Sequence, residues 1–132
     1  MEIKVSKEDG RVPVTLVHVD GNIDSATYES FQSRVEELIQ EGARDILVDL
    51  AHVPYISSAG LRSLQSIFNQ LRVLSPDVSD AEMRRGVSAG SYKSPHLKLV
   101  NMSDAASKAF TMAGFDMYIE VFDDVQKAVA AF

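Results

Sequence analysis

The 132-residue chain contains no cysteine and no tryptophan. The lack of cysteine excludes disulfides, thiol catalysis and cysteine-ligated metal sites, and it is typical of a reducing compartment. No apolar run approaches the roughly 18 residues of a membrane span, and the first residues lack the basic region and apolar core of a secretory signal. We therefore expect a cytoplasmic protein that does not insert into a membrane.

Basic residues are scarce relative to acidic ones. Lys and Arg number 13 against 19 Asp and Glu, which gives a net charge of -6. Nucleic acids and anionic lipids both require basic patches on the proteins that bind them. The charge therefore argues against both, and another protein is the expected partner. The apolar share of 45% and the charged share of 24% predict a single globular domain over residues 1–132.

The chain also lacks the motifs of several enzyme classes. It has neither the Gly-x-x-x-x-Gly-Lys-Ser/Thr motif nor the Gly-x-Gly-x-x-Gly motif, so it has no recognisable nucleotide-binding loop of its own. A serine hydrolase would use Ser58 as nucleophile, but Ile56 stands where the first glycine of the motif is required, and His96 is the one histidine downstream. His18, His52 and His96 are too scattered to indicate a metal site. We expect no enzymatic activity, no cofactor and no bound metal.

Hydrophobic periodicity predicts an α/β fold. An Asp-Gly turn signal at residues 9–10 joins two strand-like runs, 2–5 and 12–20, into an antiparallel hairpin. A helix over 25–41, capped by Asp24 or Ser25 and stopped by Gly42, then leads to a strand at 45–50. This order predicts parallel strands with a right-handed crossover. Later elements are expected as strands at 96–102 and 117–121 and helices at 103–113 and from 123.

The expected fold is thus a small mixed sheet of about four to five strands, with an antiparallel N-terminal hairpin and then parallel βαβ units, packed with about four helices. Residues 75–95 are rich in Ser, Gly and Pro and show no clear apolar period, which predicts a long loop with at most one helical turn at 80–85. Arg84 and Arg85 in this loop are expected to be solvated. Three methionines are expected to fill the core: Met102, Met112 and Met117.

Two adjacent serines, Ser57 and Ser58, lie between a buried strand and an amphipathic helix. Apolar residues recur at helical spacing downstream, at Leu61, Leu64, Phe68 and Leu71, so the helix starts near one of the serines. Serine is a preferred N-cap residue. A phosphate at this point would also meet unpaired amides and the positive end of the helix dipole. The residues alone leave a capping role and a switching role open.

Three motifs resemble those of the STAS domain family, the anti-sigma factor antagonists. The run Asp49-Leu-Ala-His-Val-Pro-Tyr-Ile-Ser-Ser-Ala-Gly-Leu61 resembles the family signature. Val19-Asp-Gly-Asn-Ile-Asp24 resembles the stretch before the family's first long helix, and Phe110-Thr-Met-Ala-Gly-Phe115 resembles the end of a C-terminal helix. The resemblance covers nearly the whole chain and implies one STAS-like domain.

The resemblance implies phosphorylation-dependent partner switching. An unmodified antagonist binds an anti-sigma factor serine kinase and frees the sigma factor, and phosphorylation by that kinase ends the binding. The phosphorylated serine of the family falls on Ser58. Ser57 is the alternative acceptor, because this chain has a second serine where many members have Asp just before the modified serine. The acidic residue close to the site falls on Asp24. ATP would belong to the kinase, and a metal-dependent serine phosphatase would reverse the modification.

The expected partner-binding surface joins the turn before the first helix to the start of the second: Asn22, Asp24, Tyr55, Ser57, Ser58, Ala59, Gly60, Leu61 and Arg62. Within it, Ser57 is the expected cap and Ser58 the expected phosphate acceptor. The alternative is a non-phosphorylated STAS scaffold or sensor-linked module, or a transporter-associated docking module.

Overall fold

The computed structural model describes residues 1–75 and 79–132. Their strands form one sheet in the order β1-β2-β3-β4-β5, antiparallel between β1 and β2 and parallel in every later pair. The predicted mixed sheet with an N-terminal hairpin is therefore confirmed. The strands are β1 (Glu2–Asp9), β2 (Pro13–Asp20), β3 (Ile46–His52), β4 (Leu97–Val100) and β5 (Glu120–Phe122).

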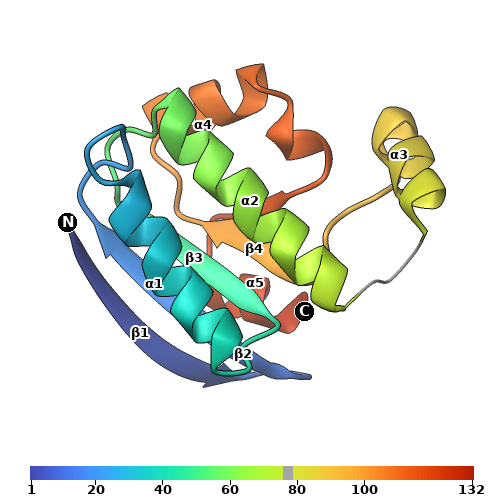
Figure 1. Cartoon of the computed structure of the whole chain (residues 1–132), viewed down its shortest axis with the longest axis horizontal. Helices are drawn as coiled ribbons and strands as arrows, with labels where there is room; N and C mark the ends of the chain where they lie inside the picture. Colours follow the sequence, from blue (N-terminus) through green and yellow to red (C-terminus); the bar gives the residue numbers. More distant parts are fainter. Residues whose placement is uncertain (76–78) are drawn as a thin grey trace.

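Helices cover both faces of the sheet. α1 (Tyr28–Gln40) and α2 (Ser58–Leu74) lie side by side on one face, and the short α5 (Val125–Ala130) lies on the other (Figure 1). Central strands must then be apolar on both sides. In β3, Val48 belongs to the larger core cluster with α1 and α2, and Leu47 belongs to the smaller cluster with α5. This double burial explains the apolar run from which the strand was predicted.

The prediction for the start of α1 was wrong. α1 begins at Tyr28 rather than Ser25, and neither Asp24 nor Ser25 is its cap. The Asp24 carboxylate instead accepts a hydrogen bond from the Ala26 amide at 2.9 Å, and the Thr27 hydroxyl donates to the Asn22 carbonyl at 2.6 Å. Asp and Thr often satisfy a turn in this way, in competition with a helix. The result is an ordered turn between β2 and α1.

The predicted long loop at 75–95 was also partly wrong, because it contains α3 (Asp80–Ala89). The Ser79 hydroxyl accepts from the Glu82 amide at 3.2 Å, and Gly90 ends the helix with φ +75°. No residue of α3 is fully buried, although Met83 and Val87 pack against the core, so the helix leaves a weak apolar pattern and its caps contribute to its stability. Residues 76–78 of the predicted loop lie outside the described residues. α3 lies far from the start of α2 (Figure 1).

The C-terminal elements differ from the predicted bounds by a few residues. α4 (Asp104–Met112) is followed by a short 3₁₀ helix, η1 (Phe115–Met117), and the strand expected from residue 117 begins at Glu120. Met102 packs against the core as expected, but Met112 and Met117 are 79% and 42% exposed. Their assignment to the core was wrong. Ala106 and Phe110 supply the buried face of α4, which leaves Met112 outside it, and Met117 lies in η1, which has no buried residue. In the described residues, no helix is long and apolar enough to cross a membrane.

Candidate functional site

The turn after β2 and the segment after β3 run side by side. The Ile23 amide donates to the Tyr55 carbonyl at 3.1 Å, and the Ser57 amide donates to the Ile23 carbonyl at 2.9 Å. Ile23 and Ile56 form a parallel bridge, and both are fully buried. Backbone pairing and burial thus hold the two segments together. The structure brings the predicted residues of the 20–24 turn next to those at the start of α2.

Ser57 is the N-cap of α2, as predicted. It has an extended backbone, its hydroxyl accepts from the Gly60 amide at 3.3 Å, and its carbonyl accepts from the Leu61 amide at 2.9 Å. Ser58 is the first helical residue and is exposed. Among the described residues, its hydroxyl has no hydrogen-bond partner. The two hydroxyls therefore differ: one is occupied by the helix, and the other is available at the surface.

This difference predicts unequal effects of two alanine substitutions. Ser57→Ala removes a side-chain cap and is expected to lower the free energy of unfolding by about 1 kcal/mol. Ser58→Ala removes an exposed hydroxyl without a structural partner and should change it by less than about 0.5 kcal/mol. Urea denaturation of both variants measures the difference. Equal losses would contradict the assignment of Ser57 as the cap.

Gly60 allows α2 to approach the 20–24 turn. A Cβ atom on Gly60 would lie 2.4 Å from the Ile23 carbonyl oxygen and 2.8 Å from Cγ2 of Ile56. Gly60 and Leu61 are both buried. Of the predicted partner-binding residues, these two lie beneath the surface and position the others. Those that are exposed or half-buried are Asn22, Asp24, Tyr55, Ser57, Ser58, Ala59 and Arg62.

Two residues outside the predicted binding surface support it. The Ser103 hydroxyl caps α4 and also donates to the Pro54 carbonyl at 2.9 Å, which ties α4 to the segment before Ser57. The Asp49 carboxylate accepts from the Ala51 amide at 3.0 Å and orders the chain where β3 ends. Ser103 carried a sequence signal as a helix cap, but its second contact depends on the tertiary structure.

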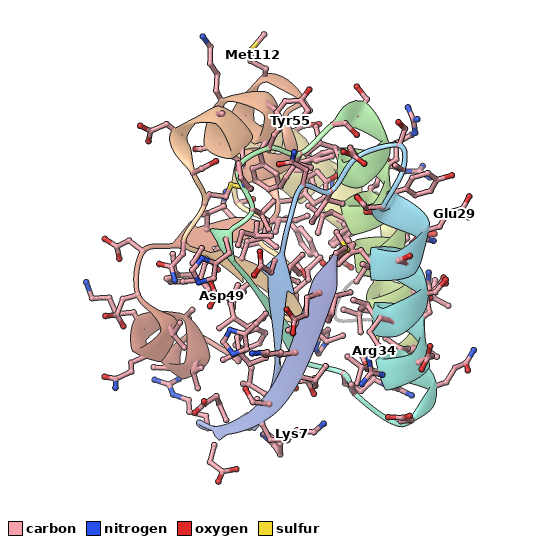
Figure 2. All side chains as sticks on the ribbon, turned by 90° about the vertical axis from the view of Figure 1, so that its left-hand side faces the viewer. Lys7, Glu29, Arg34, Asp49, Tyr55 and Met112 are labelled. Carbon is pink, nitrogen blue, oxygen red and sulfur yellow. The ribbon has the colours of Figure 1, made fainter. Side chains whose placement is uncertain are left out.

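Two large apolar side chains are exposed at one end of the molecule. Tyr55 and Met112 lie at the same end of the molecule, opposite Lys7 (Figure 2). Tyr55 is 48% exposed.

Two of the three histidines contact aspartates. His18 Nδ1 lies 2.9 Å from Oδ2 of Asp49, and His96 Nδ1 lies 2.8 Å from Oδ1 of Asp45. Each ring is thus engaged by an aspartate of the neighbouring strand region. Within residues 1–75 and 79–132, no three metal-ligating side chains are grouped closely enough to hold an ion.

The shifted pKa values belong to residues away from the serines. The hydrogen bond and the charge of Arg72 hold the pKa of the Asp80 carboxyl below its usual value. Burial raises the pKa of Tyr118, whose ring packs against Phe68 with the centroids 4.8 Å apart. Asp80 begins α3, and Phe68 lies in the second half of α2. The electrostatic perturbations therefore concern the attachment of α3 and the core, not the serine pair.

A sequence profile of the STAS domain matches residues 4–75. BtrV of Bordetella bronchiseptica, named as a candidate anti-sigma factor antagonist, is 27% identical over 132 residues, which cover 100% of this chain and 95% of BtrV.

Solved structures share the fold. A Thermotoga maritima protein, described as a candidate anti-sigma factor antagonist, has a TM-score of 0.71 at 16% sequence identity. The alignment covers 96% of this chain and 90% of the Thermotoga chain. The Bacillus cell fate determinant SpoIIAA in its phosphorylated form has a TM-score of 0.63 at 13% identity and covers 97% and 96%.

Proposed function

The chain belongs to the STAS domain family, and from this premise we propose that it is an anti-sigma factor antagonist that acts by phosphorylation-dependent partner switching. The unmodified protein binds an anti-sigma factor serine kinase, and phosphorylation of Ser58 releases it. A metal-dependent serine phosphatase restores the unmodified form. BtrV supports the antagonist role, since it is similar over the whole chain.

One observation carries the assignment to Ser58. Its hydroxyl is exposed and unengaged at the start of α2, whereas the Ser57 hydroxyl is used as a cap. A kinase needs a serine whose hydroxyl can reach its own active site. Modification of Ser57 would first have to break the cap, at about 1 kcal/mol. The geometry therefore favours Ser58 over its neighbour.

The site tolerates a phosphate within the protein itself. Phosphorylation adds about 1.5 to 2 negative charges at neutral pH. α2 has no acidic residue in its first turn to repel that charge, and the helix dipole stabilises it by about 0.3–1 kcal/mol. The carboxylate of Asp24 lies in the adjacent turn and accepts a hydrogen bond from the Ala26 amide. The fold should survive modification. A partner contact over Ser58 should not, because a desolvated or sterically blocked charge weakens binding by several kcal/mol.

A binding assay tests the function. The purified protein is mixed with the anti-sigma factor serine kinases of the same genome, with ADP or with ATP, and complexes are measured by size-exclusion chromatography. We expect a complex with one kinase in ADP and its loss after incubation with ATP. A complex that persists when Ser58 is fully phosphorylated would instead support a scaffold or transporter-associated docking module. No kinase complex in either state would contradict partner switching.

A further inference from the structure

Arg62 is an exposed cation on α2, four residues after Ser58. Among the described residues, its guanidinium has no hydrogen-bond or ion-pair partner. Two other arginines are engaged: Arg34 pairs with a glutamate of its own helix, and Arg44 donates to two backbone carbonyls. The charge of Arg62 is thus uncommitted in the unmodified protein.

The spacing places Arg62 within reach of a phosphate on Ser58. Residues four apart on a helix lie on the same face, with their Cβ atoms about 5–6 Å apart. Long side chains lean toward the N-terminus of the helix, which here is the direction of Ser58. A guanidinium binds two phosphate oxygens at once, and this makes arginine the preferred partner of phosphorylated residues. The first turn of α2 holds no carboxylate that would compete for the guanidinium.

We propose that Arg62 is a specificity-determining residue of the switch, an inference that rests on the proposed modification of Ser58. While Ser58 is unmodified, the guanidinium of Arg62 binds an acidic group of the kinase. After modification, it turns to the phosphate on its own helix. Phosphorylation then weakens the complex in two ways, since it adds a dianion and also withdraws a cation from the docking surface.

The proposed pairing of Arg62 with a phosphate on Ser58 is tested without any kinase. Phosphoserine is incorporated at position 58 during translation, and the phosphate is titrated by ³¹P NMR in the native sequence and in Arg62→Gln. A nearby cation favours the dianion, so Arg62→Gln should raise the second pKa of the phosphate and lower its ionisation constant about twofold. Arg62→Lys should keep part of the effect.

The matched control is Lys108→Gln, which removes one charge from an exposed residue of α4. It should leave the titration of the phosphate unchanged. Identical titrations for the native sequence and Arg62→Gln would overturn the intramolecular pairing, as would equal shifts in Arg62→Gln and Lys108→Gln.

The proposed contact of Arg62 with an acidic group of the kinase is tested with unmodified protein. Arg62→Gln should bind the cognate kinase about tenfold more weakly than the native sequence, and Lys108→Gln should bind equally well. Unchanged affinity of Arg62→Gln would overturn this contact. If Arg62 shifts the titration but no kinase modifies Ser58, the proposed function fails and the pairing stands. If Ser58 is modified and the titration does not shift, only the role of Arg62 fails.

Discussion

Ser58→Asp is expected to bind its cognate anti-sigma factor serine kinase about a hundredfold or more weakly than the native protein, a loss of about 3 kcal/mol. The carboxylate would place a charge at an exposed point of the docking surface, where the native hydroxyl carries none. Ser58→Ala should bind with nearly native affinity and resist modification. Isothermal titration calorimetry with the kinase in ADP measures both affinities.

Ser57→Asp is the matched control. It adds the same charge one residue away, and aspartate caps a helix about as well as serine does. Because the Ser57 side chain points to the Gly60 amide rather than outward, we expect its affinity to stay within a few-fold of native. Equal losses in Ser57→Asp and Ser58→Asp would show that the charge of the region matters and not the position. Native affinity of Ser58→Asp would contradict a switch at this serine.

Gly60→Ala is expected to lower the free energy of unfolding by about 1–3 kcal/mol, the usual range for an overpacked site. The new methyl group would overlap the Ile23 carbonyl, which is backbone and cannot rotate away. Either the 20–24 turn or the start of α2 must move. Since both carry the proposed docking surface, kinase binding should weaken as well.

Urea denaturation and kinase titration measure the two effects of Gly60→Ala. Arg62→Ala, an exposed substitution two residues further along the same helix, should leave the free energy of unfolding within about 0.5 kcal/mol of native. A Gly60→Ala variant with native stability and native affinity would show that the close approach does not hold the site together.

The hydrophobic patterns and the helix cap were predicted correctly from the sequence. The continuous apolar run of β3 is buried on both faces, as such a run predicts. The spacing of apolar residues in α2 defines its buried face, and Ser57 is the cap that a serine at this junction suggests. These features follow from hydrophobic patterning and cap chemistry, which act over neighbouring residues and need no knowledge of the tertiary structure.

The errors arose where local hydrogen bonds or tertiary contacts determine the bounds of a helix or the burial of a residue. Asp24 looks like a helix cap, but its carboxylate serves the turn before α1. α3 has two caps and no buried residue, so its apolar pattern was too weak to detect. Met112 is apolar in type but falls on the outer face of α4. In the candidate site, pairing of Ile23 with Ile56 could not be read from either segment alone.

Mapping the phosphorylated residue tests the central claim most directly. The protein is incubated with its cognate kinase and ATP, digested, and the modified peptide is sequenced by mass spectrometry, with Ser58→Ala as the control. The peptide that spans both serines should carry one phosphate, located on Ser58, and the Ser58→Ala variant should carry none. Phosphate on Ser57, or no phosphate in the native protein, would contradict the account.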